Sequence, residues 1–310
     1  MAPTDVSVII PTLNAAGTIK RIIHMLQTQE QPAMEITIID SGSTDETRAL
    51  TESLGAKVLT IEPETFDHGK TRNLAAERAH GKVLVFMTQD VLPVDTKLIL
   101  KLIKPLEDPD VAVTYARQVA APEATLSEQH LRLYNYPPVS KIKSKANLPE
   151  LGINTFQCSN ACAAYRRSTF ETLGKFPYPV ACNEDMIFSA RAIQAGYKVA
   201  YTAEAVVQHT HNFGCRELFK RYFDISASLD HEPGIRTLGR SESRGLVFLK
   251  DQMNFVRDQK KPQMLPRVLF ETGAKFLGFK AGANHTRIPQ YLKEHLGMNK
   301  QYWSKQAKQS

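Results

Sequence analysis

The stretch KVLVFMTQDVLPVD, residues 82–95, predicts a buried strand that ends in a polar turn. Its run 83–87 is apolar and rich in β-formers, which is typical of a central strand covered on both faces. The triplet TQD follows, and Pro93 cannot donate a ladder hydrogen bond, so the strand ends there. Ligands of open α/β sheets bind just beyond the carboxyl ends of the strands. Asp90 therefore has two interpretations: a carboxylate that holds a hard cation against a diphosphate, or a simple cap of the next turn.

Segments on both sides of this strand alternate between strand and helix patterns. Residues 15–27, for example, carry apolar side chains at helical spacing, and Asn14 stands where it can cap that helix. Strands that alternate with helices in this way build a doubly wound sheet of Rossmann-like type. The sequence therefore predicts an α/β fold with a mainly parallel sheet. The other expected strands are residues 6–10, 35–40, 57–61, 111–115, 156–165 and 197–201.

Two regions depart from this alternation. Residues 117–155 look irregular and are rich in Lys, Pro and Ser, which is typical of a disordered or functional connection. Residues 231–310 are mostly helical in pattern and hold 15 Lys or Arg against 6 Asp or Glu, a net +9 in a chain whose total is +7. That excess suggests a polyanionic partner, either an anionic membrane surface or nucleic acid, although a merely solvated basic face explains it equally well.

The composition, 42% hydrophobic and 23% charged over 310 residues, is ordinary for one large or two modest globular domains. No apolar stretch approaches the ~18 residues that a membrane span needs, and the first residues lead into a strand without a signal-peptide pattern. The four cysteines form no CxxC pair and no zinc spacing. We therefore expect reduced thiols in a cytoplasmic protein.

Polar side chains gather at the ends of the expected strands and in nearby loops. Each cluster alone has an ordinary explanation: Asp40 can form a turn, and acids at residues 184–185 are favoured at a helix N-terminus. His209 and His211 would point the same way from a strand, a pair that is structural more often than metal-bound. Together the clusters suggest one shared site. They are residues 11–14, 40–43, 90, 183–185 and 208–212.

The sequence resembles the family 2 inverting glycosyltransferases with the GT-A fold. The matching motifs are VSVIIPTLNAAGTI (6–19), IIDSGSTDET (38–47), HGKTRN (68–73), LVFMTQDVLP (84–93) and the NED…AGY segment (183–197). The match covers residues 5–230. FDHGKTRN and TQDVLP are most similar to the bacterial rhamnosyltransferases that build surface polysaccharides and use dTDP-L-rhamnose.

The resemblance implies a domain plan and an activity. Residues 1–230 would form the GT-A domain, with a nucleotide-sugar half at 1–115 and an acceptor half at 116–230, followed by a basic helical extension at 231–310. The implied activity is metal-dependent, inverting transfer of L-rhamnose from dTDP-β-L-rhamnose to a lipid-linked saccharide acceptor in O-antigen, capsule or exopolysaccharide synthesis. Two alternatives stay open: the same fold with a UDP- or GDP-sugar donor, and a non-catalytic basic protein that binds membrane or nucleic acid.

A diphosphate leaving group gains negative charge as the sugar–oxygen bond breaks, and a divalent cation stabilises that charge. By resemblance Asp90 is the carboxylate ligand of Mg²⁺ or Mn²⁺, and His209 is the second protein ligand, with His211 as the alternative. Most relatives carry Asp-x-Asp where this chain has TQD at residues 88–90, so only the last carboxylate is present. The rhamnosyl branch often shows the same change.

The remaining site residues follow from the same resemblance. Asp185 matches the general base that takes the proton of the acceptor hydroxyl, with Glu184 and Asn160 beside the acceptor. Arg72 would neutralise phosphate or orient Asp90, unless it forms a surface ion pair. Residues expected to bind the donor are Pro11, Thr12, Asn14, Asp40, Ser43, Arg72, Gln89 and Asp90, with Asp40 accepting from the pyrimidine N3–H.

The expected partners are a nucleotide-sugar donor and a saccharide or polyprenyl-linked saccharide acceptor, with no nucleic acid. The basic extension contains Phe270, Phe276, Leu277 and Phe279 among Lys275 and Lys280. Such a segment can rest on a membrane, which would place the protein in the cytoplasm at the cytoplasmic face of the inner membrane. It can equally form the contact face of a homodimer.

Overall fold

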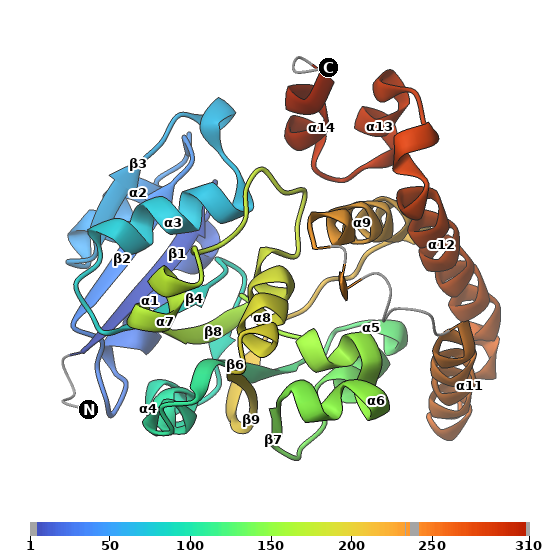
Figure 1. Ribbon diagram of the computed structural model, residues 1–310, viewed down its shortest axis with the longest axis horizontal. Coiled ribbons are helices and arrows are strands. Elements are labelled where there is room, and N and C mark those ends of the chain that lie inside the picture. Colours follow the sequence, from blue (N-terminus) through green and yellow to red (C-terminus); the bar gives the residue numbers. More distant parts are fainter. Residues whose placement is uncertain (1–4, 233, 236–241, 308–310) are drawn as a thin grey trace.

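The computed structural model describes residues 5–232, 234–235 and 242–307 (Figure 1). One sheet forms the centre of these residues, in the order β3-β2-β1-β4-β8-β6-β9-β5, with β7 paired to β9. The strands are β1 (Val6–Thr12), β2 (Glu35–Asp40), β3 (Lys57–Thr60), β4 (Val83–Met87), β5 (Leu92–Pro93), β6 (Val111–Val119), β7 (Lys141–Lys143), β8 (Cys162–Arg166) and β9 (Lys198–Gln208).

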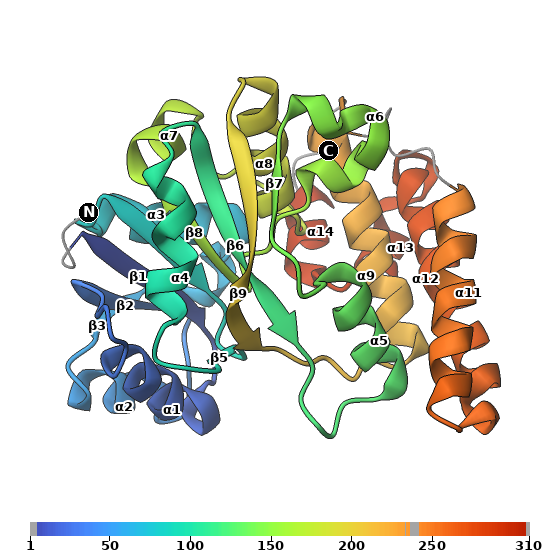
Figure 2. The same cartoon turned by 90° about the horizontal axis from the view of Figure 1, so that it is seen from below.

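Helices pack on both faces of this sheet, and the C-terminal helices lie beside α9 at one side of it (Figure 2). The helices of the first half are α1 (Ala16–Gln27), α2 (Thr47–Ser53), α3 (His68–Arg78), α4 (Leu98–Ile103), α5 (Leu126–Asn135) and α6 (Leu148–Leu151). Those of the second half are α7 (Arg167–Thr172), α8 (Glu184–Gln194), α9 (Cys215–Ser228), α11 (Glu242–Asp258), α12 (Leu265–Ala283), α13 (Gln290–Leu296) and α14 (Lys300–Ala307).

The four strands β3, β2, β1 and β4 run parallel, as the alternating sequence pattern predicts. Every residue of β4 is buried, because side chains alternate between the two covered faces of the sheet. Phe86 belongs to one apolar core with Tyr165 and Phe188, whereas Val85 belongs to the other with Ile22. The polar residues that follow β1, β2 and β4 therefore meet at one edge of the sheet.

The other half of the sheet is mixed rather than parallel. Strand β8 runs antiparallel to both β4 and β6, β9 runs parallel to β6, and the short strands β5 and β7 pair antiparallel with β9. An apolar run carries no signal of strand direction, so the sequence pattern did not report this change. The strand expected at 156–165 starts only at Cys162, because residue 156 ends a 3₁₀ helix and residues 157–161 form a loop.

The prediction that residues 117–155 are irregular is wrong. This segment completes β6 and contains α5, β7 and α6. Helix α5 lacks the apolar stripe of a typical packed helix, because Glu128, His130 and Arg132 occupy its buried face. These side chains have partners inside the protein: Glu128 pairs with Arg132, and His130 bonds to Asp251. A periodicity argument that counts apolar residues therefore misses the helix.

Helix α12 packs closely against α9. At Gly278 and Gly282 the two backbones come very close together. A Cβ at Gly278 would lie 2.2 Å from the backbone oxygen of Phe219, and one at Gly282 would lie 2.2 Å from that of Phe223, closer than real Cβ atoms come. Glycine is required at both positions for this approach. Among the described residues, no helix is both long and apolar enough to cross a membrane.

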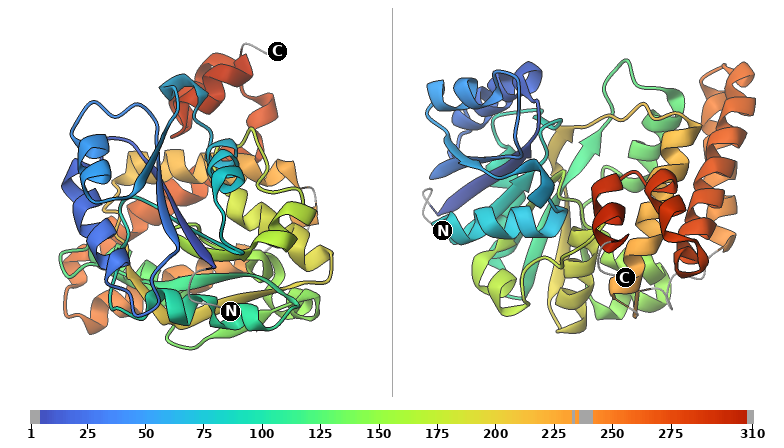
Figure 3. Two further views of the ribbon diagram at one scale, coloured as in Figure 1. Left: turned by 90° about the vertical axis from the view of Figure 1, so that its left-hand side faces the viewer. Right: turned by 90° about the horizontal axis from the view of Figure 1, so that it is seen from above.

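The last two helices, red in Figure 3, are fastened back onto α9 and onto the N-terminal half. Asp224 of α9 accepts hydrogen bonds from the backbone of Met298 and Asn299 and from the indole of Trp303, each at 2.8–2.9 Å. On its other side α14 reaches the loop before α3, where Gln301 donates to the backbone oxygen of Pro63 at 2.7 Å. The end of the described chain therefore bridges two distant parts of the fold.

Substituting Gly278 by alanine should lower the free energy of unfolding by about 1–3 kcal/mol, because the new methyl group forces α12 away from Phe219. Gly273→Ala in the same helix is the matched control, since a Cβ there meets nothing within 4 Å. That variant should keep its stability or gain up to about 1 kcal/mol through helix propensity. Urea unfolding followed by circular dichroism measures both changes. Equal midpoints for the two variants would contradict the close contact between α9 and α12.

Candidate active site

A cavity of about 610 Å³ opens at the carboxyl ends of β1, β4 and β9 and at the N-terminus of α8. Its walls come from segments far apart in the sequence, including the loop before α14. The predicted residues that line it are Pro11, Thr12, Arg72, Gln89, Asp90, Asn160, Glu184, Asp185, His209 and His211. Asn14, Asp40 and Ser43, which were also predicted, are not part of this lining.

One part of the cavity holds three groups that can ligate a metal ion. Asp90 follows β4, and His209 and His211 follow β9. Asp90 Oδ2 lies 3.3 Å from His209 Nε2 and 3.6 Å from His211 Nε2, and one ligand atom from each residue falls within 4.8 Å of the others. Both imidazoles, and not only one of them, are therefore within reach of a cation at Asp90.

The protonation states of this cluster suit a divalent cation. Burial lowers the pKa of His209, and burial together with the neighbouring His209 lowers the pKa of His211 to about 3. Burial alone would raise the pKa of Asp90, but the close contact of its carboxylate with the imidazole of His209 holds that pKa below the usual range. At neutral pH the cluster is one carboxylate beside two uncharged imidazoles. This donor set fits a metal that accepts both nitrogen and oxygen ligands.

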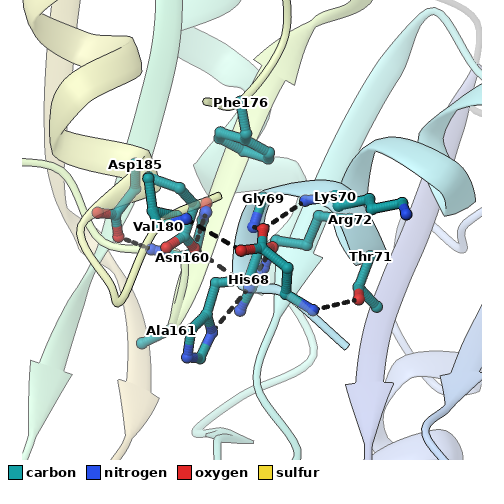
Figure 4. A network of polar contacts seen from close by, with 12 residues as sticks. His68, Gly69, Lys70, Thr71, Arg72, Asn160, Ala161, Phe176, Val180 and Asp185 are labelled. Atoms are coloured by element: carbon teal, nitrogen blue, oxygen red, sulfur yellow. Dashed lines mark hydrogen bonds and ion pairs between the residues drawn. The ribbon is translucent and has the colours of Figure 1, made fainter. Parts of the chain in front are cut away.

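Helix α8 contributes two adjacent acids to the same cavity. Glu184 is buried, accepts from Asn160 Nδ2 at 3.0 Å and pairs with Arg72 Nη1 at 3.1 Å. Asp185 is partly exposed, and its carboxylate accepts from the backbone nitrogens of Asn160 at 2.8 Å and Met186 at 2.7 Å (Figure 4). The guanidinium of Arg72 thus pairs with Glu184, while Asp185 accepts hydrogen bonds from neutral donors.

The two acids differ in pKa for this reason. Burial raises the pKa of Glu184, but the positive charge of Arg72 outweighs it, so the net shift is downward. Burial and the negative charge of Glu184 both act in the same direction on Asp185 and raise its pKa to about 7. Paired carboxylates whose pKa values are pushed apart are typical of sites where one of them moves a proton.

Arg72 is buried, which excludes the surface ion pair considered above. Its Nη1 donates to the backbone oxygen of His68 at 3.0 Å in addition to pairing with Glu184. Among the described residues no hydrogen bond or ion pair joins Arg72 to Asp90, so Arg72 orients Glu184 and not the metal ligand. Its Nε has no hydrogen-bond partner among the described residues, which leaves one buried donor in a residue that lines the cavity.

The side chains of Asn14, Asp40 and Ser43, which are predicted to bind the donor, form hydrogen bonds around the turn after β2 and do not line the cavity. Asp40 is fully buried, and its carboxylate accepts from the backbone and hydroxyl of Ser43 and from the hydroxyl of Thr12. Asn14 does not cap α1; its side-chain oxygen accepts from the backbone of Thr44 at 2.9 Å. Asp40 therefore shapes the turn in this conformation, and its contact with a pyrimidine stays a prediction.

Gln89 fastens the loop after β4 to the loop after β1. Its side-chain oxygen accepts from Leu13 N at 2.7 Å, and its side-chain nitrogen donates to Leu13 O at 3.1 Å. The hydroxyl of Thr18 donates to the backbone oxygen of Gln89 at 2.8 Å. These bonds set the position of Asp90, the next residue, relative to β1.

The cavity lining also includes residues for which the sequence predicts no role, among them His68, Arg221, Asp224, Met298, Asn299 and Gln301. The sequence could have indicated His68, because this residue lies in the HGKTRN motif that carries the family resemblance. Arg221 and Asp224 belong to an amphipathic helix, where charged side chains look like an ordinary surface. Residues 298–301 reach the cavity only through the docking of α14, which no local pattern reports.

The sequence matches known proteins over most of its length. The family described as Glycosyl transferase family 2 matches residues 7–174. The chain is 40% identical over 302 residues to the O-antigen chain rhamnosyltransferase RfbN of Salmonella typhimurium strain LT2, with 96% of each chain covered. It is 39% identical to the O-antigen chain rhamnosyltransferase WbaN of Salmonella anatum, with 96% of this chain and 95% of the other covered.

Solved structures show the same fold. TarS of S. aureus, residues 1–349, has a TM-score of 0.56 at 16% identity, with 92% of this chain and 91% of the other covered. The mannosyltransferase PcManGT from Pyrobaculum calidifontis, in complex with GDP-Man and Mn²⁺, has a TM-score of 0.54 at 19% identity over 99% and 88%. The predicted GT-A fold with a helical C-terminal region is thereby confirmed. The chain belongs to glycosyl transferase family 2 and is a glycosyltransferase.

Proposed function

We propose that the chain is an inverting rhamnosyltransferase of O-antigen synthesis, which moves L-rhamnose from dTDP-β-L-rhamnose to a saccharide acceptor. One observation carries this proposal: a cluster of metal-ligand groups and a carboxylate with a raised pKa line the same cavity, as transfer from a sugar diphosphate requires. The sugar and the kind of product are taken from RfbN and WbaN, which are similar over nearly the whole chain.

In this proposal residues 1–115 hold the nucleotide sugar, residues 116–230 hold the acceptor, and residues 231–310 are a basic extension. Pro11 and Thr12, at the end of β1, contact the base and ribose. Asp40 and Ser43 keep Thr12 and the following loop in place through their mutual hydrogen bonds. The unpartnered Nε of Arg72 is the donor that we assign to the diphosphate.

Asp90, His209 and His211 would hold a divalent cation, which supplies positive charge to the departing diphosphate. The choice between Mg²⁺ and Mn²⁺ follows from ligand chemistry. Mg²⁺ prefers oxygen ligands, whereas imidazole nitrogen is a softer donor that suits transition metals better. With two histidines beside one carboxylate, we expect Mn²⁺ to support the reaction better than Mg²⁺. Gln89 keeps the Asp90 loop aligned for this purpose.

Asp185 is assigned as the general base. As the acceptor oxygen bonds to the anomeric carbon, the bond from that carbon to the diphosphate breaks, and the acceptor proton passes to the Asp185 carboxylate. One displacement of this kind inverts the β-linked donor into an α-L-rhamnoside. Asn160 holds Asp185 through its backbone nitrogen and Glu184 through its side chain, so these two residues define where the acceptor hydroxyl can bind.

The cavity weighs against a non-catalytic protein that binds nucleic acid or membrane, because such a protein has no need of two adjacent acids beside metal-ligand groups. A UDP- or GDP-sugar donor is the alternative outcome. Solved relatives are described with UDP-GlcNAc and with GDP-Man, but at 16% and 19% identity they indicate the fold and not the donor.

Purified protein incubated with dTDP-β-L-rhamnose, Mn²⁺ and a polyprenyl-linked saccharide should release dTDP, and a chelator should stop the release. Asp185→Asn should lower the rate about 10²–10⁴-fold, because an amide cannot accept the acceptor proton. Binding of dTDP to this variant, measured by calorimetry, should stay unchanged. Asp110→Asn, at an exposed acid that pairs with Lys198, is the matched control and should keep full activity.

Two results would contradict separate parts of this assignment. Full activity of Asp185→Asn would remove Asp185 from the role of base. A thermal-shift ranking in which UDP or GDP stabilises the protein more than dTDP would replace the donor while leaving the reaction class in place.

The pH dependence of transfer follows from the raised pKa of Asp185. The base works only when ionised, so kcat/KM should rise about tenfold per pH unit below about 7 and level off above it. Glu184→Gln removes the adjacent negative charge and leaves Arg72 to act on Asp185, so the pKa falls and the rise should move to lower pH. A shift to higher pH in this variant would contradict the assignment.

We also propose that α12 rests on an anionic membrane surface, where a lipid-linked acceptor would be carried. Phe270, Phe276 and Leu277 are 73%, 56% and 58% exposed, at the spacing of one helix face. That face lies opposite the glycines that contact α9, and α11 and α12 form the outer edge of the molecule (Figure 2). The net +9 of residues 231–310 complements anionic lipid headgroups.

The double variant Phe270→Glu, Phe276→Glu should bind phosphatidylglycerol vesicles at least about tenfold more weakly, because each phenylalanine contributes ~2 kcal/mol when buried in lipid. Leu100→Glu, at an exposed leucine on α4, is the control and should bind as the wild type does. Vesicle sedimentation at low and high salt measures the effect. Unchanged vesicle binding with loss of a dimer in sedimentation velocity would make α12 a dimer face instead.

A further inference from the structure

His209 makes a contact on the ring edge away from Asp90. Its Nδ1 lies 2.7 Å from Gln118 Oε1, whereas its Nε2 lies 3.3 Å from Asp90 Oδ2. Gln118 is buried near the end of β6, which pairs with β9 and therefore runs beside His209. The backbone of His209 also donates to Val119 O at 2.9 Å, so the two strands hold the residues in register.

The neighbours of Gln118 determine which way its amide faces. Arg132 Nη1 donates to Gln118 Oε1, and a guanidinium can only donate. On the other side, Gln118 Nε2 donates to Tyr136 OH and to Ser159 Oγ, each at 2.8 Å. The reversed amide would set its NH₂ group against the guanidinium, so the oxygen must face Arg132 and His209.

This orientation selects one tautomer of His209. Because Gln118 Oε1 accepts a hydrogen bond from Nδ1, the proton of the neutral His209 ring must be on Nδ1. Nε2 then carries a lone pair. That lone pair faces the carboxylate oxygen of Asp90, which is also an acceptor. Two acceptors 3.3 Å apart are satisfied when a cation binds to both.

We propose that Gln118 is the positioning residue of the candidate metal centre: its side-chain oxygen holds the Nδ1 proton of His209 and thereby leaves Nε2 as the ligand atom beside Asp90. The assignment rests on the metal dependence in the proposed function. It adds a role that neither the motifs nor the cavity lining indicates, because Gln118 does not line the cavity.

Two residues of α5 hold this arrangement from behind. Glu128 Oε1 accepts from Arg132 Nε at 2.7 Å, which fixes the guanidinium that orients Gln118. The same oxygen accepts from the backbone nitrogen of His211 at 3.1 Å. The Glu128–Arg132 pair therefore fixes the side chain of one histidine through Gln118 and the backbone of the other directly. Outer contacts of this kind change metal affinity about 10–100-fold when they are removed.

The test measures metal binding and the tautomer, not transfer. In the presence of dTDP, Gln118→Leu should bind Mn²⁺ about 10–100-fold more weakly in an electron paramagnetic resonance titration, because His209 loses its fixed proton. Gln118→Glu keeps an acceptor for Nδ1–H and should retain the affinity. Gln129→Leu changes a glutamine of α5 whose side chain donates to the backbone of Ala124, and it should bind Mn²⁺ as the wild type does.

The tautomer is read in the wild-type protein, and a variant serves only to assign the signal. In ¹⁵N spectra of histidine-labelled protein, with His209 assigned through His209→Asn, the Nδ1 of His209 should carry the proton. A proton on Nε2, or wild-type Mn²⁺ affinity in Gln118→Leu, would overturn the role of Gln118 alone. Failure of the wild-type protein to bind Mn²⁺ at all would overturn both this role and the metal dependence in the proposed function.

Discussion

The site depends on two adjacent carboxylates at the start of α8, with one buried guanidinium placed against the first of them. Burying a carboxylate costs several kcal/mol unless a cation or hydrogen bonds compensate for the lost hydration. Arg72 compensates Glu184, whereas Asp185 accepts from the backbone N–H groups of Asn160 and Met186. Because Arg72 keeps Glu184 ionised, the negative charge of Glu184 makes a second ionisation at Asp185 unfavourable. The proton affinity of Asp185 is therefore set by the position of α3, which carries Arg72, relative to α8.

The position of α3 relative to α8 is fixed by contacts at the start of α3. Asp67 caps the helix by accepting from the backbone of Gly69 and Lys70, and its other oxygen accepts from the backbone of Val180 (Figure 4). At Gly69 a Cβ would lie under 3.0 Å from the backbone oxygen of Pro177, so only glycine allows the segment before α8 to run this close. The HGKTRN motif thus supplies both the buried cation and the close contact that aligns it with the acids.

The sequence predicted structure and site residues best where a local pattern or motif is sufficient by itself. The apolar run of β4 followed by Asp90 located a strand end, and the family motifs led to Glu184 and Asp185 before any geometry was known. The prediction failed where the role of a residue or strand depends on a partner that is distant in sequence. The direction of β8 and the polar buried face of α5 leave no local pattern. Nor does the sequence indicate that Arg72 pairs with Glu184 rather than with Asp90, because 112 residues separate the two.

The C-terminal extension contributes to the site in a way that its helical, basic composition does not suggest. Asp224 holds the backbone of Met298 and Asn299 at the cavity wall. Helix α11 supports α5 through the bond between Asp251 and His130, and Val256 packs on the start of α5. The segment matched by the family, residues 7–174, contains Asp90 and Arg72 but ends before Asp185 and the two histidines. The family match therefore does not reach the proposed base or the two histidines, and the proposed sugar and acceptor depend on relatives that are similar over nearly the whole chain, extension included.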